Sequence, residues 1–449
     1  MDMNTKSLSM IMAAMVFCVS CDNNTCLRMR KYLEGIKVID THEHQRQPGE
    51  FHFYRHLSYF HADVQTAGAP ANIDSMIKIT PHVDSLWRVY GEYINDGRAT
   101  SYYDEWIRGF QLCYGLDKPY LSREDVSHLS LQMEEKYKNY PAWFNECFSR
   151  FNFQIMFLDP YWNQFNVAID TVHFALVFRI DSAITGVVNA ATTREITTPS
   201  LLNLLNKKEA IDVSSLDRYL EVMDTVLKIF VRHRVVCLKN ALAYHRSISF
   251  SDVDNSTAEK IYASGIISET AKKQLEDFMF HWFIKKSIQY HLPVQIHTGY
   301  LAGLNGKLDD SHPMQLLPLI RQYPEACFVL FHGGYPWTGD FIVLGKEFPN
   351  VMLDMVWLCQ LSRTAAIRTL HEILDAVPYN KICWGGDVTY IEQAVGSLSL
   401  AREVVATVLA ERIEKGWLTE EVARDIGRKI FRENAIRIYR LEEKYGIKK

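Results

Sequence analysis

The sequence of 449 residues lacks the signals that mark several specialised protein classes. Its nine cysteines have no paired spacing, which excludes a disulfide framework and a zinc ribbon. A net charge of −4 leaves no basic surface for nucleic acid. After residue 19 the chain has no apolar run that would span a membrane, no repeat and no low-complexity tract. What remains is a chain with 48% hydrophobic residues, long enough for a large core and suited to a small-molecule substrate.

The N-terminal segment is the exception to this plain pattern. Lys6 precedes an apolar run at residues 8–19, and Cys18-Val19-Ser20-Cys21 resembles a bacterial lipobox. We expect a lipoprotein signal peptide at 1–20, followed by a tether at 21–36 with a lipid on Cys21. That lipid would hold the protein on the bacterial cell envelope, at its periplasmic or outer-membrane face. An uncleaved hydrophobic start and an ordinary cleaved signal are the alternatives. The sequence does not distinguish a monomer from a homo-oligomer.

Short β-rich runs alternate with helical stretches along most of the chain. Helical spacing of apolar residues recurs at 216–232, 271–290 and 314–323, between the β-rich runs. Alternation of strand and helix is the pattern of a parallel sheet, and eight units predict a (β/α)₈ TIM barrel over residues 37–449. The eight predicted strands lie at or near 37–44, 153–158, 174–178, 235–239, 293–297, 327–332, 351–357 and 381–387.

An unusually long connection separates the first two predicted strands. It covers about 50–150, is rich in aromatic residues, and has helical runs at 84–94 and 101–114. We therefore expect a mainly helical lid insertion. Because a connection that follows a barrel strand lies on the catalytic face, the lid would shape substrate choice. Its aromatic residues would equally suit a dimer surface or a small core of its own.

Residues that bind metals stand at the ends of the predicted strands. His42 and His44 are two apart on one strand, so both imidazoles project from the same face and reach one ion. Taken singly, each such histidine has a plainer role in the core, Asp387 could cap a helix, and Lys239 could form an ion pair. Their joint position at five strand ends favours a metal site. The set consists of His42, His44, Lys239, His297, His332 and Asp387.

This ordered set resembles the amidohydrolase superfamily. Segments 238–246, 294–300 and 384–392 are similar to its amidohydrolase-related branch (amidohydrolase 2), which includes domains fused to glutamine synthetase-like proteins. The resemblance covers residues 38–439. It implies metal ligation by His42, His44, His297 and Asp387.

For the remaining two residues the resemblance leaves the number of metal ions open, at one or two. Lys239 matches the lysine that becomes a carbamate between two metals in binuclear members, or it would pair with a substrate carboxylate. His332 matches a residue that binds the second metal in binuclear members and polarises the substrate in mononuclear ones.

The donor types also suggest the chemistry. Imidazoles with a carboxylate suit Zn²⁺, and more oxygen donors would allow Mn²⁺ or Fe²⁺. Such an ion activates water, Asp387 would accept and return its proton, and His332 and Lys239 would complete the catalytic set. We expect a hydrolase that cleaves a C–N or C–O bond, other than a peptide bond. The alternatives are a metal-dependent decarboxylase or uronate-type isomerase, and a non-catalytic surface lipoprotein that binds a ligand.

Substrate contacts are expected from residues that follow other strand ends. Arginine suits the bidentate recognition of a carboxylate, so a carboxylated substrate is the prediction. The alternative for each arginine is a salt bridge to a loop carboxylate. The predicted substrate-binding residues are Arg179, Arg246, Tyr300 and Trp357.

Overall fold

The structure of the chain is a computed structural model that describes residues 23–45, 61–69, 82–303 and 305–449. The predicted signal peptide and Cys21 lie outside the described residues, as do 50–60 and 70–81 of the predicted insertion. Among the described residues, none of the helices has the length and apolar character of a membrane span.

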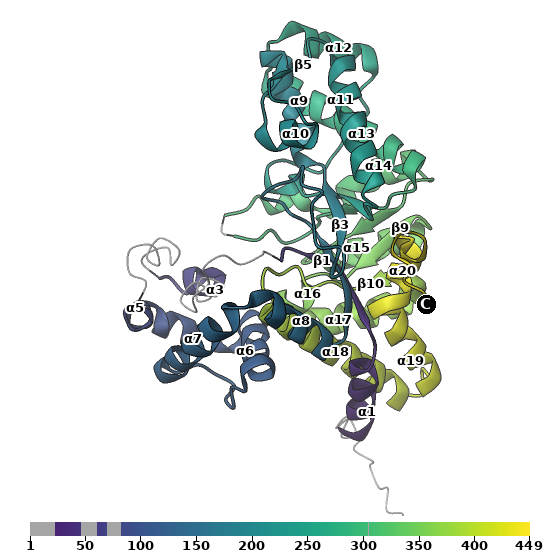
Figure 1. Cartoon of the computed structure of the whole chain (residues 1–449). Coiled ribbons are helices and arrows are strands. Elements are labelled where there is room, and N and C mark those ends of the chain that lie inside the picture. The colour runs from purple at the N-terminus through teal and green to yellow at the C-terminus, as the bar shows by residue number, and fades with distance from the viewer. Residues whose placement is uncertain (1–22, 46–60, 70–81, 304) are drawn as a thin grey trace, which may run out of the picture.

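A parallel sheet of eight strands forms the centre of the molecule, in the order β1-β2-β3-β6-β7-β8-β9-β10 (Figure 1). Backbone hydrogen bonds from His44 N to Val388 O (2.9 Å) and from Asp387 N to His42 O (2.8 Å) join β1 to the segment after β10. The sheet therefore closes into the predicted (β/α)₈ barrel. Its strands are β1 Val38–Glu43, β2 Phe153–Leu158, β3 Phe174–Arg179, β6 Cys237–Asn240, β7 Val294–Ile296, β8 Phe328–Leu330, β9 Val351–Asp354 and β10 Ile382–Cys383.

Alternating side chains of the strands build two separate cores. Ile39, Phe157 and Val329 point into the barrel, where Tyr439 of the C-terminal segment also packs. Their neighbours along the strands, such as Val38, face the surrounding helices and join the larger outer core. This is why the strands are almost continuously apolar: both of their faces are buried.

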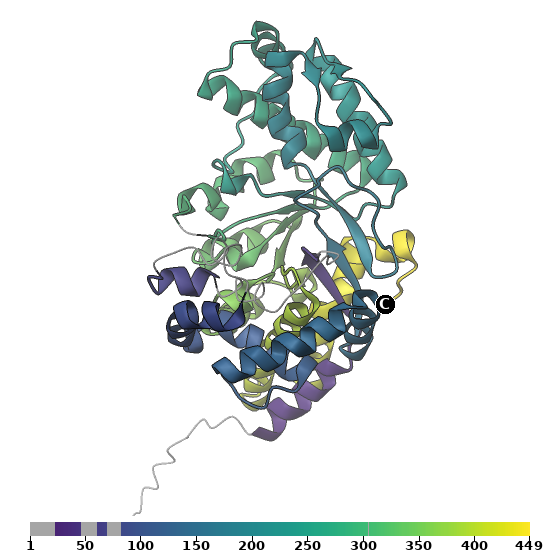
Figure 2. The same cartoon turned by 60° about the vertical axis from the view of Figure 1, so that its left-hand side comes forward.

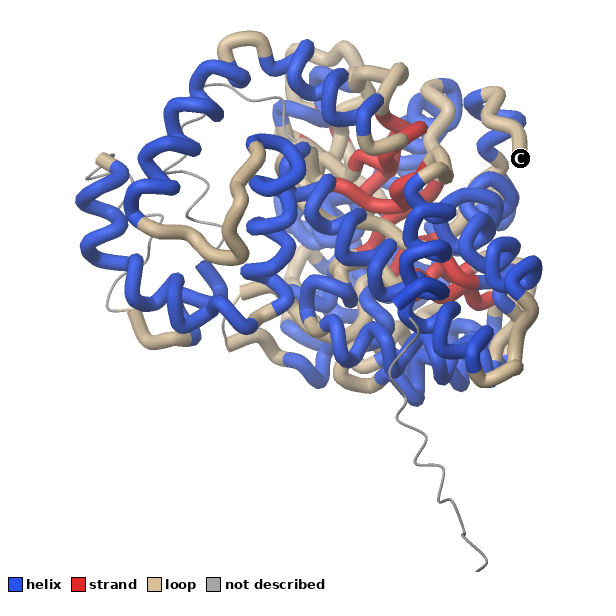
Figure 3. The backbone as a smooth tube through the Cα atoms, turned by 90° about the horizontal axis from the view of Figure 1, so that it is seen from below, coloured by secondary structure: helices blue, strands red, loops and turns tan. Residues whose placement is uncertain are grey.

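Helices surround the strands on the outside, as the view from below shows (Figure 3). Helix α9 Asp181–Thr193, which follows β3, belongs to a helical projection that stands away from the barrel (Figures 1 and 2). A short antiparallel pair, β4 Glu195–Ile196 and β5 Ile211–Asp212, lies in the same projection. Its other helices are α10 Pro199–Leu204, α11 Leu216–Arg232, α12 Asn255–Ser264 and α13 Glu269–Tyr290.

The remaining helices complete the outer layer. α11 matches the predicted 216–232, and α13 extends the predicted 271–290 by two residues. The predicted helix at 314–323 divides into the 3₁₀ turn Pro313–Leu316 and a shorter α14, because Pro318 stands in the first turn of that helix. These helices are α14 Leu317–Gln322, α15 Thr338–Glu347, α16 Leu358–Leu361, α17 Arg363–Ala376, α18 Ile391–Glu414, α19 Glu420–Arg428, α20 Asn434–Ile438 and α21 Leu441–Tyr445.

The described part of the segment between β1 and β2 is helical and has a core of its own. Its central aromatic residues, Tyr90, Tyr103, Trp106 and Phe110, are all buried together. The segment packs on the barrel through the long contact between α6 and α18. Its helices are α3 His61–Thr66, α5 Val83–Asp96, α6 Ser101–Tyr114, α7 Arg123–Tyr137 and α8 Tyr140–Arg150.

One segment differs from the sequence prediction. The tether predicted at 21–36 contains a helix, α1 Asn23–Glu34, where the structure describes it. Met29 and Leu33 lie one helical turn apart, are both buried, and pack into the outer core, where α1 contacts α18. Burial of this apolar stripe stabilises the helix against the barrel.

Candidate metal centre

Two histidines lie at the mouth of the barrel: His42 in β1, and His44 directly after it. His42 is buried, and the ring of His44 lies 4.8 Å from it, centroid to centroid. His44 Nδ1 lies 2.8 Å from the backbone oxygen of Asp159, so this nitrogen carries the proton that it donates. With the proton on Nδ1, the lone pair of His44 Nε2 would bind an ion in place of its present contact with Asp387 Oδ1 at 3.1 Å.

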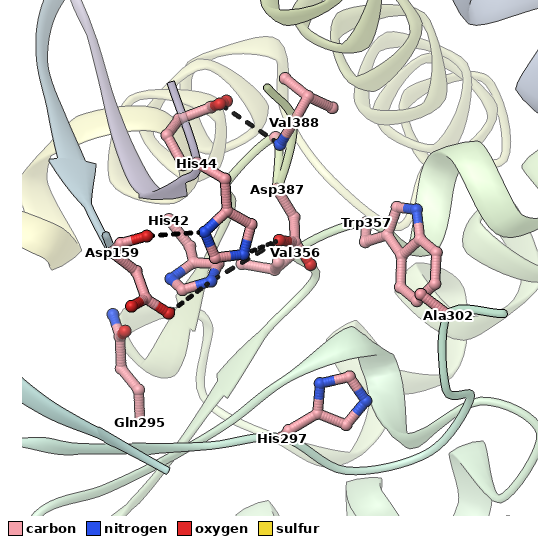
Figure 4. Close-up of polar contacts among 12 residues, drawn as sticks. His42, His44, Asp159, Gln295, His297, Ala302, Val356, Trp357, Asp387 and Val388 are labelled. Atoms are coloured by element: carbon pink, nitrogen blue, oxygen red, sulfur yellow. Dashed lines mark hydrogen bonds and ion pairs between the residues drawn. The ribbon is translucent and has the colours of Figure 1, made fainter. Parts of the chain in front are cut away.

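Two carboxylates flank these imidazoles, from segments that follow β2 and β10, the strands on either side of β1 (Figure 4). Asp159, directly after β2, places Oδ2 3.7 Å from His42 Nε2. Asp387, after β10, places Oδ1 3.6 Å from His42 Nε2 and 3.1 Å from His44 Nε2. The prediction brought His42, His44 and Asp387 together, and the structure does so as well. Asp159 was not predicted.

The donor set fits a divalent cation. One ligand atom each from His42, His44 and Asp159 lies within 4.8 Å of the others. His42 Nδ1 and both carboxylate oxygens of Asp159 are buried without a hydrogen-bond partner among the described residues. Unpaired buried polar atoms are costly, and a bound cation would satisfy the oxygens. Burial and the nearby cation of Lys239 hold the pKa of His42 well below its usual range, so its imidazole is neutral, as ligation requires.

His297, which was predicted as a metal ligand, contacts His332 and the backbone of Tyr300. It reaches the group through His332: His332 Nε2 lies 2.9 Å from His297 Nδ1, and His332 Nδ1 lies 3.9 Å from Asp387 Oδ2. The outer nitrogens of the pair face the backbone oxygens of Val356 (3.1 Å) and Tyr300 (2.8 Å). If His332 Nδ1 donates to Val356 O and His297 Nε2 donates to Tyr300 O, then His332 Nε2 and His297 Nδ1 each present a lone pair to the other. These two nitrogens then need a proton between them. His297 is thus a partner of His332, apart from the group of His42, His44 and Asp159.

At the barrel mouth the acid Asp387 is charged, whereas the imidazole of His332 is neutral. Burial lowers the pKa of His332 to about 4, so this ring is neutral at pH 7. Burial would raise the pKa of Asp387, but His42 and His44 beside it hold that pKa well below its usual range. Asp387 is therefore an ionised carboxylate, which is the state of a general base.

Lys239 ends β6 inside the barrel, as predicted. Its Nζ lies 3.8 Å from the centre of the Phe331 ring and has no hydrogen-bond partner among the described residues. Burial, with a contribution from Arg179, lowers the pKa of its amine to about 8. An amine near its titration point, buried and unpaired, is able to react with carbon dioxide or to pair with an anion.

A pocket of about 560 Å³ opens directly above these residues. Arg179 is its buried cation, with Nε 3.4 Å from Asp159 Oδ2 and 3.3 Å from Asp181 Oδ2. Trp357 is another wall, as predicted, and donates from Nε1 to the hydroxyl of Tyr102 at 2.9 Å. Since Tyr102 begins α6, the insertion supplies part of this pocket. The polar and aromatic lining includes Tyr102, Tyr161, Gln164, Arg179, Ser182, Thr185, Tyr244, His245 and Trp357.

Two predicted substrate contacts are placed elsewhere. Arg246 forms salt bridges with Glu276 at 3.0 Å and with Asp277, which lie in helix α13 and not in a loop as the alternative had it. Tyr300 packs its ring on Trp357, with 5.7 Å between centroids, and is not part of the pocket wall.

Of the site residues that were not predicted, Asp159 has a recognisable sequence signal, whereas Tyr102 and Tyr244 have none. Asp159 follows the apolar run 153–158 directly, which is the same signal that identified Asp387. Tyr102 and Tyr244 carry no comparable signal, because nothing in their local sequence indicates that they meet at the mouth.

Comparisons with known proteins agree with this fold. Residues 275–441 match the family model described as amidohydrolase. Over 225 residues, 46% of this chain, the sequence is 29% identical to protein fluG of Emericella nidulans, and the match spans about a quarter (26%) of that relative.

Solved structures resemble the chain over nearly all of its length. Glucuronate isomerase of Caulobacter crescentus has a TM-score of 0.71 at 14% identity, covering 95% of this chain and 96% of its own. Uronate isomerase of Thermotoga maritima has a TM-score of 0.69 at 15% identity, covering 93% and 97%. At such identities the likeness concerns the fold.

Proposed function

We propose that this chain, whose residues 275–441 match the amidohydrolase family model, is a metal-dependent hydrolase that cleaves a C–N or C–O bond of a small carboxylated substrate. The single observation that carries the proposal is the convergence of His42, His44 and Asp159, three potential ligands within 4.8 Å, beside the ionised Asp387. A divalent ion at this place, with Zn²⁺ the first choice and Mn²⁺ or Fe²⁺ the alternatives, supplies Lewis acidity and lowers the pKa of water.

The residues around the ion would divide the remaining work. Asp387 has a carboxylate oxygen 3.1 Å from His44 and is held ionised, so it takes a proton from water and returns it to the leaving group. His332 is neutral and lies 3.9 Å from Asp387, where it donates a hydrogen bond to a substrate oxygen once the substrate displaces its present partners.

Arg179 would orient the substrate. It lines the pocket, and its guanidinium already faces two carboxylates, Asp159 and Asp181. A substrate carboxylate would compete for the same planar group, which suits bidentate contacts. Asp159 would then be free to turn fully toward the ion.

Lys239 has two candidate roles, and metal content distinguishes them. As a carbamate, formed when its amine adds to carbon dioxide and releases a proton, it would hold a second ion. As a free ammonium it would pair with the substrate. We expect added bicarbonate to raise the bound metal of the wild-type protein, but not of Lys239→Met, if the carbamate forms. Metal content that does not respond to bicarbonate leaves the ammonium role.

The activity is tested with a panel of N-acyl amino acids, lactones and uronates. Mass spectrometry reports the product: hydrolysis adds one water, whereas isomerisation leaves the mass unchanged. Asp387→Asn should lose at least about 10²-fold in kcat, since it removes the general base. Activity that survives this substitution contradicts the role proposed for Asp387.

Metal content tests the site itself, independently of any substrate. After dialysis, the metal content of Asp159→Asn should be about one tenth of the wild-type content or lower, because the substitution replaces an anionic donor. Elemental analysis measures the metal content. Asp217→Asn, an exposed residue of α11, is the matched control. Equal metal content in the two variants would contradict the proposed site.

A uronate-type isomerase is the second candidate. The observation that favours it is the polar lining of the pocket, where Ser182, Thr185 and Gln164 would suit a polyhydroxylated acid. The isomerases of similar fold are consistent with this candidate. Conversion of a uronate without change of mass would select it.

A further inference from the structure

A second hollow adjoins the pocket at the barrel mouth. The pocket above the metal centre and a neighbouring cavity of about 580 Å³ share two wall residues, Thr185 and His245. These shared residues place the two hollows next to each other, and we refer to the two hollows together as the groove. A small substrate confined to the metal centre would leave the outer half of this groove unused.

Helix α9 forms one wall of the groove along its whole length. Ser182, Thr185, Asn189 and Thr192 follow each other at steps of three, four and three residues, which places them on one face. At 1.5 Å per residue, the face from Ser182 to Thr192 is about 15 Å long. Its hydroxyl and amide groups suit a polar chain, such as one of amides or polyols, better than a hydrocarbon.

The far end of the groove carries one weakly paired cation. Within the described part of the chain, the one ion pair of Lys272, in the first turn of α13, is with Glu269 at 4.0 Å, and the Lys272 side chain is 46% exposed. The other charged residues of this wall are Arg246 and Glu276, which form an ion pair with each other at 3.0 Å. Lys272 is thus the group that would meet an anionic end of a ligand.

We propose that the substrate is an elongated polar molecule with a carboxylate at each end, which lies along α9 between the metal centre and Lys272. The inference rests on the carboxylated substrate of the proposed function and extends it, because it adds a distal chain and a second anionic group. Arg179 holds the end near the metal, and Lys272 contacts the remote end.

Binding of a synthetic length series tests the inference without requiring turnover. The probes are N-succinyl-(Gly)ₙ peptides of increasing length, with the N-propionyl peptides as analogues that lack one carboxylate. Calorimetry on the metal-loaded full-length protein gives the Kd. We expect the affinity to rise at least about tenfold from the shortest to the longest succinyl peptide, as the polar chain fills the groove.

Three variants locate the effect. Asn189→Trp places a bulky ring in the groove from an exposed position of α9 and should remove the gain for long peptides while short ones bind as before. Lys272→Gln should weaken succinyl binding about threefold or more and leave propionyl binding unchanged. Lys285→Gln, an exposed lysine farther along α13, is the control and should change neither.

The outcomes separate this inference from the proposed function. Length-dependent binding without cleavage of any probe would support the groove and speak against the hydrolase. Cleavage of short probes with affinity that is independent of length would support the hydrolase and overturn the groove. An equal loss in Lys272→Gln and Lys285→Gln, or no binding by any member of the series, would also overturn it.

Discussion

At the scale of single residues, three side chains of the barrel mouth stand on unusual backbone. His332, Trp357 and Asp387 have φ values of 64°, 61° and 60°, in the left-handed region. This conformation costs a non-glycine residue roughly 1–2 kcal/mol. The neighbouring hydrogen bonds hold it in place, among them Asp387 N to His42 O at 2.8 Å. Strain of this kind is concentrated at functional sites, and here it affects Trp357 and Asp387, which line the pocket, and His332, which lies 3.9 Å from Asp387.

Asp387 allows charge and backbone to be tested separately. Asparagine adopts the left-handed conformation readily, so Asp387→Asn should unfold at a temperature close to that of the wild type. The free energy of unfolding of Asp387→Ala should be roughly 1 kcal/mol lower than that of Asp387→Asn, because alanine has no side-chain hydrogen bond that favours the left-handed conformation. Thermal unfolding of both metal-free variants measures the difference. Equal stability of Asn and Ala would show that the backbone at Asp387 is unstrained.

The residues also show how far sequence reasoning reaches. His42, His44 and Asp387 were predictable, because each ends a β-rich run and parallel strands bring their ends together. The orientation of His297 was not, since it depends on a 2.9 Å contact with His332. Arg179 and Arg246 had the same local pattern, and only the fold decides that Arg246 meets Glu276 and Asp277.

At the scale of elements, one buried carboxylate joins the insertion to the barrel. Glu392, in the first turn of α18, accepts hydrogen bonds from three side chains of the insertion. Tyr114 donates at 2.6 Å, Tyr137 at 2.8 Å and Trp143 Nε1 at 2.8 Å. Because these donors end α6, end α7 and lie in α8, a single residue orients three helices. The pocket depends on this arrangement, since Tyr102 of α6 reaches Trp357.

Glu392→Gln should therefore loosen the insertion and leave the barrel intact. The amide keeps one acceptor oxygen but turns an NH₂ group toward the other donors, at a cost of about 1–3 kcal/mol. Hydrogen exchange should accelerate in α6, α7 and α8 and stay unchanged in the barrel strands. Glu421→Gln, exposed on α19, is the control. Uniform acceleration over the whole chain would contradict a local role.

Elements were more predictable than the contacts between them. The apolar runs at 153–158 and 174–178 are the strands β2 and β3, and helical spacing located α6 and α11. The helix α1 was not predicted, because the segment directly after the lipobox-like motif is typical of a tether. Its apolar stripe of Met29 and Leu33 is buried through contact with α18, which lies more than 350 residues later in the sequence.

At the scale of the whole molecule, burial of an acid makes stability depend on pH. Glu105 of α6 is buried, and burial raises its pKa to about 8 from 4.5. Gln393 Nε2 donates to its Oε2 at 3.2 Å, and its Oε1 has no partner among the described residues. The native state therefore keeps a proton that the unfolded chain releases between about pH 4.5 and 8.

This acid should lower the free energy of unfolding as pH rises through that window. Stability from the protonated Glu105 is complete below pH 4.5 and is lost toward pH 8, by up to about 1.4 kcal/mol per pH unit. Glu105→Gln mimics the neutral acid and should flatten the profile, measured by denaturant unfolding from pH 5 to 8. A variant whose profile keeps the wild-type slope would show that Glu105 does not titrate in this range.

The N-terminal segment contains the sequence motif from which we predict the location of the protein. We propose that Cys21 carries a lipid, on the basis of the lipobox-like Cys18-Val19-Ser20-Cys21 alone. Cys21→Ala should shift the protein from the membrane fraction to the soluble fraction of fractionated cells. Cys26→Ala, in α1, is the control. An unchanged distribution of the Cys21 variant would remove the anchor.

Closure of the barrel has a consequence for the time at which the site comes into being. The bonds between His44 and Val388, and between Asp387 and His42, unite the first and last strands, and these same segments carry the proposed ligands and base. A ribosome must therefore complete almost the entire polypeptide before the two halves meet. Shortened chains that stop before residue 387 would carry His42, His44 and Asp159 but would lack both the base Asp387 and the bonds that close the barrel beside them.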